Sequence, residues 1–200
     1  MKLSVIIPVY NQEELVIKAL DSIPIRDDIE IIVIDDGSTD KTYANVLSYV
    51  FHHEEKNILL LQNEENRGVG YTVNRGYDNA TGEYVVLLGS DDYFYTNEFE
   101  KALDTLDGTD MIYFNLIDNT GAIWRITPQN KNSYVGSVKF MRREFIGDTR
   151  CPEKRALEDV SFHEQLMAKN PTEKYLDTII KHYNFPRENS LTDLVLKGKL

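Results

Sequence analysis

Two pairs of adjacent carboxylates are the residues of this sequence with the clearest capacity for chemistry. Asp35 and Asp36 end one apolar run, and Asp91 and Asp92 follow another. A turn that caps a helix needs only one such side chain, and burying charge without a partner is expensive. We therefore predict that the first pair accepts hydrogen bonds from a base or a ribose, a task that requires a fixed acceptor at the end of a strand.

The second pair, Asp91 and Asp92, is predicted to bind a divalent cation. Carboxylate oxygens are the hard ligands that Mg²⁺ and Mn²⁺ prefer, and these ions also bridge substrate phosphates. The first hundred residues carry seven basic and nineteen acidic side chains, whereas the rest carry fifteen and fourteen. An anion bound by the acidic half needs a cation to offset this field. The alternative is a capping turn before the helix predicted over 97–106.

Glu158 and Asp159 form a third acidic pair, at the start of a predicted helix that carries Phe162 and Leu166 on one face. The helix dipole alone favours acidic residues at this position. The residues by themselves leave two alternatives open, a helix-end charge and a general base. Cys151 has no histidine placed beside it by a readable motif, so a nucleophilic role is not predicted.

The elements that must position these side chains alternate along the chain. Segments of helical periodicity separate short apolar runs at 3–9, 29–34, 58–61, 84–88 and 111–116. Such strands are typical of a parallel sheet covered on both faces, so 1–115 is predicted to form a doubly wound α/β unit. Its ligands are expected beyond the carboxyl ends of the strands. The remainder, 116–200, is predicted to pack on it within a single domain, with helices over 137–146 and 159–169 and a strand over 178–185.

Composition and charge exclude several classes of protein. The 200 residues carry a formal net charge of −11, which argues against a nucleic-acid surface because phosphate neutralisation needs a basic patch. A single cysteine rules out an intramolecular disulfide framework and fits a reducing compartment. No apolar run approaches the ~18–20 residues of a membrane span, and the run over 3–9 is interpreted as a buried strand and not as a signal peptide. We therefore expect a cytoplasmic protein without a transmembrane segment.

Four motifs stand in order over about the first 95 residues of the chain. They are VIIPVYN at 5–11, IIVIDDGSTD at 31–40, the stretch 66–84 that ends in ATGEY, and SDD at 90–92. Their order and spacing resemble the family 2 glycosyltransferases of the GT-A fold. Weaker features of the same family occur at 142–145, 158–162 and 189–192. The resemblance implies a GT-A-type, mostly parallel sheet flanked by helices, with a small C-terminal region on the acceptor side.

The same resemblance implies an inverting transfer of a sugar from a nucleoside-diphosphate-sugar donor, expected to be a UDP-sugar, to a hydroxyl of a carbohydrate or other acceptor. Asp91 matches the second aspartate of the family's Asp-x-Asp motif, which binds the metal cofactor, Mn²⁺ or Mg²⁺. Asp159 matches the catalytic base, with Glu158 in support. The donor site is expected to comprise Pro8, Tyr10, Asn11, Asp36, Ser38, Arg67, Gly68, Asn74, Ser90 and Asp91.

Two positions depart from the family pattern. Gly89 stands where the first aspartate of Asp-x-Asp is expected, and Val73 stands where many members carry a phosphate-facing arginine. Arg67 and Arg75 are the candidates to replace that charge. These departures motivate an alternative function, a catalytically weak nucleotide-sugar-binding module.

Two other α/β classes fit the motif positions less well. A receiver-like signalling domain carries its acidic pair after the first strand, whereas the pair here ends the second. A nucleotidyltransferase carries a glycine-rich phosphate loop after the first strand, where this sequence has Pro-Val-Tyr-Asn at 8–11.

Overall fold

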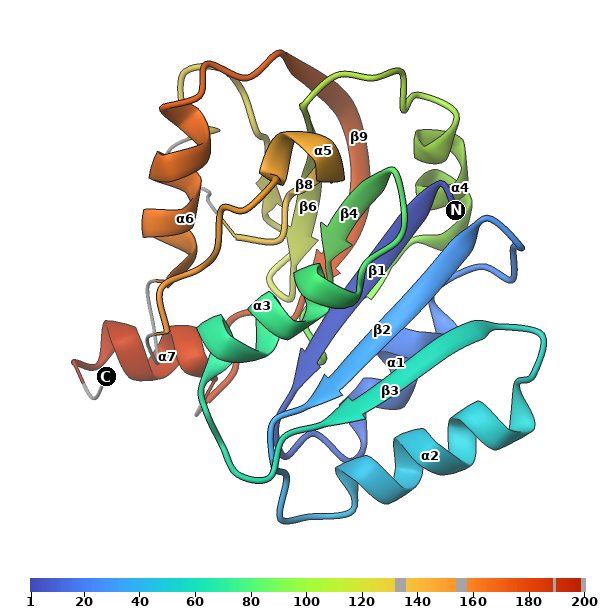
Figure 1. Cartoon of the computed structure of the whole chain (residues 1–200). Helices are drawn as coiled ribbons and strands as arrows, with labels where there is room; N and C mark the ends of the chain where they lie inside the picture. The colour runs from blue at the N-terminus through green and yellow to red at the C-terminus, as the bar shows by residue number, and fades with distance from the viewer. Residues whose placement is uncertain (132–135, 154–157, 189, 199–200) are drawn as a thin grey trace.

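A mixed sheet forms the centre of the protein, for which the computed structural model describes residues 1–131, 136–153, 158–188 and 190–198. The strands are β1 (Leu3–Val9), β2 (Ile29–Asp35), β3 (Asn57–Gln62), β4 (Tyr84–Leu87), β5 (Tyr93–Phe94), β6 (Met111–Asp118), β7 (Ile123–Trp124), β8 (Lys139–Arg142) and β9 (Glu173–Tyr183). The helices are α1 (Leu15–Asp21), α2 (Thr42–His52), α3 (Val69–Asn79), α4 (Thr96–Leu103), α5 (Arg143–Ile146), α6 (Glu158–Met167) and α7 (Leu191–Leu196). The order across the sheet is β3-β2-β1-β4-β8-β6-β9-β5, and β7 pairs with β6 (Figure 1).

The first four strands are parallel, which confirms the predicted doubly wound sheet. β1 lies between β2 and β4, and β3 pairs with the outer side of β2. The register aligns Val9 with Asp35 and Asp35 with Gln62, so these three strands end level with one another. Their carboxyl ends therefore meet at one edge of the sheet, which we call the carboxyl edge.

Helices cover both faces of this sheet, because consecutive residues of a strand point to opposite sides. Val5 and Ile7 of β1 join a buried cluster with α1, α2 and α4, whereas Ile6 joins a second cluster with α3, α5 and α6. In Figure 1, α3 and α5 lie in front of the sheet. Gly76 permits the close approach of α3, since a Cβ on this residue would lie 2.4 Å from Cγ2 of Ile6.

The C-terminal strands extend the same sheet with mixed directions. β8 is antiparallel to both β4 and β6, β9 runs parallel to β6, and β5 is antiparallel to β9. The helix predicted over 137–146 is wrong, because this segment forms β8 followed by the short α5. Phe140 and Met141 are buried on opposite faces of the sheet, so the strand lacks the polar alternation that would have distinguished it from a helix.

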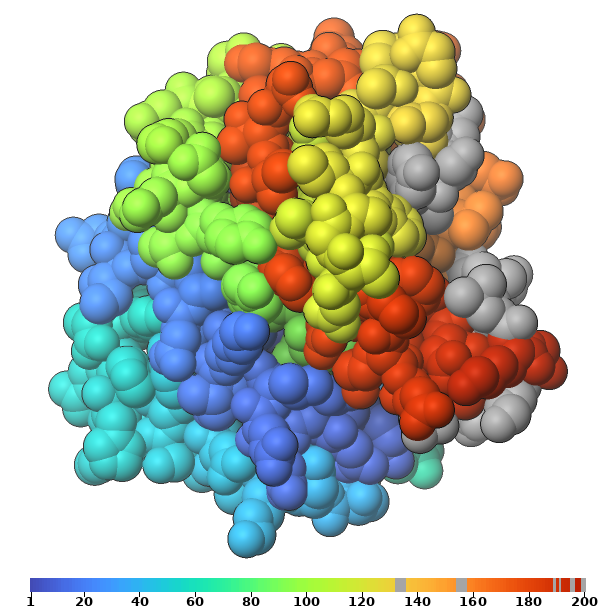
Figure 2. Space-filling view, turned by 180° about the vertical axis from the view of Figure 1, so that it is seen from behind, coloured from blue at the N-terminus to red at the C-terminus, as the bar shows by residue number. Residues whose placement is uncertain are grey.

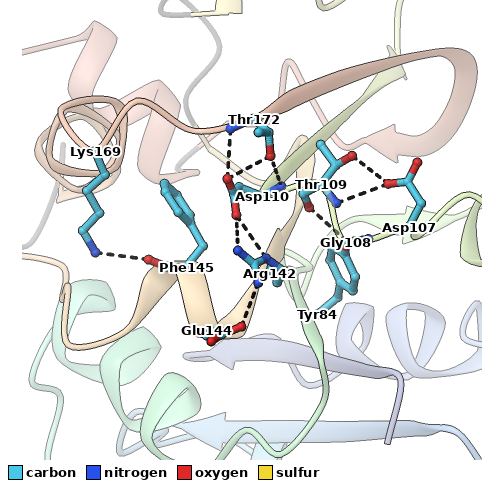
Figure 3. Close-up of polar contacts among 10 residues, drawn as sticks. All are labelled: Tyr84, Asp107, Gly108, Thr109, Asp110, Arg142, Glu144, Phe145, Lys169 and Thr172. Atoms are coloured by element: carbon cyan, nitrogen blue, oxygen red, sulfur yellow. Dashed lines mark hydrogen bonds and ion pairs between the residues drawn. The ribbon is translucent and has the colours of Figure 1, made fainter.

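An ion-pair network fixes the C-terminal strands at the opposite edge of the sheet (Figure 3). Asp110, just before β6, accepts hydrogen bonds from Nη2 of Arg142 at 2.6 Å and from the Thr172 amide at 2.9 Å. Burial raises the pKa of Asp110, but these bonds outweigh it and hold the pKa below its usual value. A hollow of about 480 Å³ lined by Met1, Glu83 and Arg142 lies at this edge, away from the carboxyl edge.

Candidate active site

The loops after β1 and β2 are joined at the carboxyl edge. The Asn11 amide donates to Oγ of Ser38 at 2.9 Å, and the Thr39 amide donates to Oδ1 of Asn11 at 2.8 Å. Asn11 has φ 50°, a left-handed conformation that asparagine tolerates better than most residues. Pro8 is partly buried, and Tyr10 is 42% exposed. The structure therefore brings the predicted residues of these two loops together and leaves the Tyr10 ring open to a ligand.

Asp36 holds the loop that follows β3. Its carboxylate accepts from Nδ2 of Asn63 at 2.6 Å and from the backbone amides of Arg67 and Gly68, both at 2.9 Å. The side chain is buried. Sequence reasoning assigned Asp36 to the base of a nucleotide, and the loop contact is an additional role that it did not predict. Any contact with a base would be made by a carboxylate already fixed by three donors.

Asp35 faces a different environment from its neighbour, since adjacent strand residues point to opposite sides. Oδ2 of Asp35 accepts from Nε2 of Gln62 at 3.0 Å and from the Ser38 amide at 3.3 Å. Oδ1 is buried and has no hydrogen-bond partner among the described residues. Asp35 therefore supports the turn after β2, and Asp36 supports the turn after β3.

The second acidic pair is neutralised by two basic residues from the end of the chain. Nη2 and Nε of Arg187 donate to Oδ2 of Asp91 at 2.7 and 3.1 Å. Nζ of Lys181 donates to Oδ2 of Asp92 at 2.9 Å, and the Asn184 amide donates to Oδ1 of Asp92 at the same distance. Burial and the charge of Asp92 raise the pKa of Asp91, while Arg187 opposes the shift. Sequence reasoning missed both basic residues.

Asp91 is the more accessible carboxylate of this acidic turn, since its side chain is 21% exposed and that of Asp92 is 3% exposed. Gly89 is closely packed against both carboxylates, since a Cβ on it would lie 3.1 Å from Oδ1 of Asp91 and 2.9 Å from Oδ2 of Asp92. Ser90 is buried. Within the described ranges, no group of three or more His, Cys, Asp or Glu residues is placed to hold a metal. One carboxylate is nevertheless enough for Mg²⁺ when substrate phosphates supply further oxygens.

Three residues of α3 and its preceding loop have partners within the protein. Both ends of the Asn74 amide bond Cys151, with its Nδ2 2.8 Å from the carbonyl and its Oδ1 2.8 Å from the amide nitrogen. Nη1 of Arg75 donates to the Gln62 carbonyl at 2.9 Å and to the Asn63 side chain. Arg67 lies over the Tyr71 ring at 4.1 Å. The Arg75 side chain is thus bonded to the end of β3. Burial raises the pKa of the Cys151 thiol to about 12, which disfavours its thiolate form.

The pair at the start of α6 divides into a buried and a more accessible carboxylate. Glu158 is 8% exposed, and its Oε2 is buried with no hydrogen-bond partner among the described residues. Asp159 is half-buried, accepts from the Val160 amide at 2.9 Å, and directs Oδ2 towards Gly136. Gly70 lets α3 approach the start of α6 and the segment before it, because a Cβ there would lie 2.2 Å from the Pro152 carbonyl oxygen and 3.4 Å from Cβ of Glu158. The structure therefore brings Glu158 next to the start of α3, which follows the loop held by Asp36.

Lys139 of β8 is a further basic residue that sequence reasoning missed. It is 3% exposed. Burial lowers its pKa to about 8, although the charge of Asp159 acts in the opposite direction. A lysine between Val138 and Phe140 was the available signal, since a charge within an apolar strand is seldom buried without a partner.

Replacing Glu158 with glutamine is expected to remove a pH dependence of stability. Burial, followed by the charge of Asp159, raises the pKa of Glu158 from 4.5 to about 7. Between these values the folded protein holds the proton and the unfolded chain releases it, so the free energy of unfolding falls as pH rises from 4.5 to 7. The shift corresponds to a loss of at most about 3 kcal/mol. Glutamine cannot ionise, so the variant should match the parent at pH 4.5 and exceed its stability at pH 8.

Urea unfolding of the two proteins across this pH range measures the difference. Glu164→Gln, at an exposed position of the same helix, is the matched control and should leave the parent's pH profile unchanged. If the free energy of unfolding changed with pH in the same way for the parent and for Glu158→Gln, folding would not raise the pKa of Glu158, which would contradict the prediction.

The segment after β9 lies against the carboxyl edge. Figure 2 shows this C-terminal segment beside the N-terminal loops, and in Figure 1 α7 lies below the start of α3. Tyr183, the last residue of β9, donates to or accepts from Oγ1 of Thr192 at 2.9 Å. Burial raises the pKa of Tyr183, and the charges of Asp92, Asp91 and Asp159 raise it further. A single ring therefore lies within electrostatic reach of both the acidic turn and Asp159.

Comparison with known proteins gives consistent matches. The chain matches the family model described as Glycosyl transferase family 2 over residues 4–174. It is 31% identical over 208 residues to the GalNAc(5)-diNAcBac-PP-undecaprenol beta-1,3-glucosyltransferase of Campylobacter jejuni, covering 96% of this chain and 67% of that protein. It is 36% identical over 139 residues to an uncharacterized glycosyltransferase of Rickettsia typhi, covering 65% of this chain and 42% of the relative. A match to a Rickettsia felis relative covers only 18% of that protein.

Solved structures show the same fold. The structure of S. aureus TarS 1-349 in complex with UDP-GlcNAc has a TM-score of 0.83 and 25% identity, covering 96% of this chain and 61% of that chain. A mannosyltransferase from Pyrobaculum calidifontis in complex with GDP-Man and Mn²⁺ has a TM-score of 0.74 and 20% identity, covering 94% and 58%. The GT-A arrangement of sheet and helices is thereby confirmed. None of the helices described for this chain is both long enough and apolar enough to cross a bilayer.

Proposed function

Because the chain belongs to glycosyl transferase family 2, we propose that it transfers a sugar from a UDP-sugar to an acceptor hydroxyl with inversion at the anomeric carbon. The observation that carries this proposal is the carboxyl edge, where Asp36 fixes the loop after β3 and Asp91 follows β4. Asp159, at the start of α6, is the candidate acidic group for the acceptor side. The likeness to TarS, solved with UDP and with UDP-GlcNAc, supports a uridine donor.

In this proposal each part of the carboxyl edge has a separate task. Tyr10 stacks on the base, and Asp36 orders the loop after β3 and accepts a hydrogen bond from the base. Asp91 holds Mn²⁺ or Mg²⁺, which would offset the negative charge that grows on the leaving diphosphate. The other donor-side residues named from the sequence are proposed to line the same site. The acceptor, a carbohydrate or another hydroxyl compound, and a cytoplasmic location are also parts of the proposal.

Asp159 is proposed to be the general base. The acceptor oxygen must lose a proton as it attacks the anomeric carbon, so a carboxylate has to lie within ~2.6–3.2 Å of it. Asp159 lies on α6 and Asp91 follows β4, which puts the two carboxylates on different elements. Glu158, buried beside Asp159, is proposed to support it and not to contact the acceptor.

A second candidate function, a catalytically weak nucleotide-sugar-binding module, is favoured by two observations. Gly89 stands in the place of the first carboxylate of the Asp-x-Asp motif, and Arg187 already neutralises Asp91. Arg75 is committed to β3. Such a module would bind the donor and release no product.

A donor screen distinguishes the two functions. Melting temperatures would be measured with UDP, UDP-GlcNAc, UDP-glucose and GDP-mannose, each with Mn²⁺ or with EDTA, and UDP release would then be followed for every donor that binds. A ligand at a hundred times its Kd stabilises a protein by ~2.7 kcal/mol, which for a chain of this size is about 5–10 °C. We expect this shift with a UDP-sugar and Mn²⁺, followed by UDP release. Binding without release would favour the module, and no shift with any nucleotide would contradict both functions.

A further inference from the structure

The two cation–carboxylate pairs of the acidic turn differ in how easily they can separate. The side chains of Lys181 and Asp92 are 2% and 3% exposed, whereas those of Arg187 and Asp91 are 27% and 21% exposed. Lys181 also donates to Oγ of Ser137 at 2.5 Å, which fixes it further. The Lys181 pair is therefore a permanent part of the interior, and only the Arg187 pair is open enough to exchange.

The backbone around Arg187 is anchored before that residue. The Asn184 amide donates to Asp92, and the Phe185 carbonyl accepts from the Asn119 amide at 2.9 Å. Neither bond involves Arg187, which follows in a segment without regular secondary structure. Withdrawal of its side chain from Asp91 thus needs rotation of a half-buried side chain and leaves β9 in place.

Charge balance determines what can replace Arg187. Asp91, Asp92, Lys181 and Arg187 sum to zero, so a divalent cation added to this group would leave two uncompensated positive charges. If Arg187 left alone, the adjacent carboxylates of Asp91 and Asp92 would share one cation, that of Lys181. Exchange of Arg187 for a divalent cation would leave one uncompensated positive charge, which an anion arriving with the cation would offset.

We propose that Arg187 is a built-in counter-ion of Asp91 that competes with the divalent cation for this carboxylate, so that loading of the donor site is coupled to release of Arg187. Both N–H groups of Arg187 bind Oδ2, and Oδ1 lies next to Gly89. The competition suppresses binding of the metal alone and favours its binding together with a diphosphate. This inference rests on the proposed function, since the anion is the donor's diphosphate.

Titration with Mn²⁺ in the absence of nucleotide tests the competition. Arg187→Gln removes the competing charge, so its Mn²⁺ affinity should exceed that of the parent by about tenfold or more. Arg26→Gln is the matched control, because Arg26 makes a two-bond pair with Asp28 at 2.8 Å just before β2, at the edge opposite the acidic turn. This control should bind Mn²⁺ like the parent. The gain should disappear in the double variant Asp91→Asn/Arg187→Gln, which would locate the ion at Asp91.

A second measurement uses the unaltered protein and does not depend on the folding of a variant. The Nε–H resonance of Arg187 should shift when Mg²⁺ and UDP are added together, while that of Arg26 should stay unchanged. An unchanged Arg187 resonance, or a Mn²⁺ affinity of Arg187→Gln no higher than that of the parent, would overturn the inference.

The same titrations separate this inference from the proposed function. Tighter Mn²⁺ binding by Arg187→Gln in a protein that binds no uridine nucleotide would support the counter-ion and reject the UDP-sugar donor. Uridine nucleotide binding with unchanged Mn²⁺ affinity would support the donor and reject the counter-ion.

Discussion

Replacing Asp159 with asparagine is expected to reduce sugar transfer by two orders of magnitude or more, with little change in donor affinity or melting temperature. Asparagine keeps the size of the side chain and can still accept the hydrogen bond from the Val160 amide. It cannot accept the proton of an attacking hydroxyl. The substitution therefore isolates proton transfer from the favourable placement of an acid at a helix start, which is worth only ~0.3–1 kcal/mol.

Transfer rates at saturating donor and acceptor, with donor affinity measured separately, check this expectation. Glu164→Gln is the matched control, because it removes a carboxylate from an exposed position of the same helix and should leave the rate unchanged. If Asp159→Asn kept a rate within a few-fold of the parent while Glu158→Gln abolished transfer, the roles within the pair would be reversed. Full activity of both variants would place the base on another residue.

Replacing Lys181 with methionine is expected to lower the free energy of unfolding by ~3–5 kcal/mol. Methionine retains the length and apolar stem of lysine but leaves the Asp92 carboxylate buried without its cation. The side chains of this pair are 2% and 3% exposed, so water cannot take the place of the lost Nζ. For a chain of this size the loss corresponds to a fall in melting temperature of roughly 6–20 °C.

Chemical unfolding of matched variants distinguishes the buried pair from an ordinary surface pair. Lys101→Met removes the partner of Glu98 in a pair whose side chains are 71% and 39% exposed, and should change stability by no more than ~1 kcal/mol. The double variant Lys181→Met/Asp92→Asn should recover part of the loss, because the buried acceptor no longer carries a charge. An equal, small effect of Lys181→Met and Lys101→Met would show that the pair is not buried in solution.

The parallel part of the fold could be predicted because its strands are continuous apolar runs. The runs at 3–9, 29–34, 58–61, 84–88 and 111–116 correspond to β1, β2, β3, β4 and β6. β8 could not be predicted in the same way. Its four residues contact strands on both sides and helices on both faces, and this environment comes from residues distant in the chain. A short window of sequence does not contain that information.

The residues of the candidate site could likewise be predicted only in part from the sequence. The polar residues that directly end the strands, such as Asp36 and Asp91, could be named from the sequence because strand ends in a parallel sheet collect at one edge. Their partners could not be named, since Lys181 and Arg187 reach Asp92 and Asp91 across 89 and 96 residues. Lys181 did carry a local signal, because it follows Ile179 and Ile180 in an apolar run. Nothing in that run indicated which carboxylate it binds.

The place of β9 between β6 and β5 has a consequence for how the protein is made. Contacts between distant parts of a chain form late, because loop closure costs entropy before the contacts compensate for it. On the ribosome, β1 to β4 emerge long before β9, so the turn that holds Asp91 and Asp92 is synthesised without its two counter-charges. The newly made parallel half therefore carries a pair of repelling carboxylates at the edge where the donor is proposed to bind. Docking of β9 neutralises that edge, so the acidic turn gains its two counter-charges only after Lys181 and Arg187 have been synthesised.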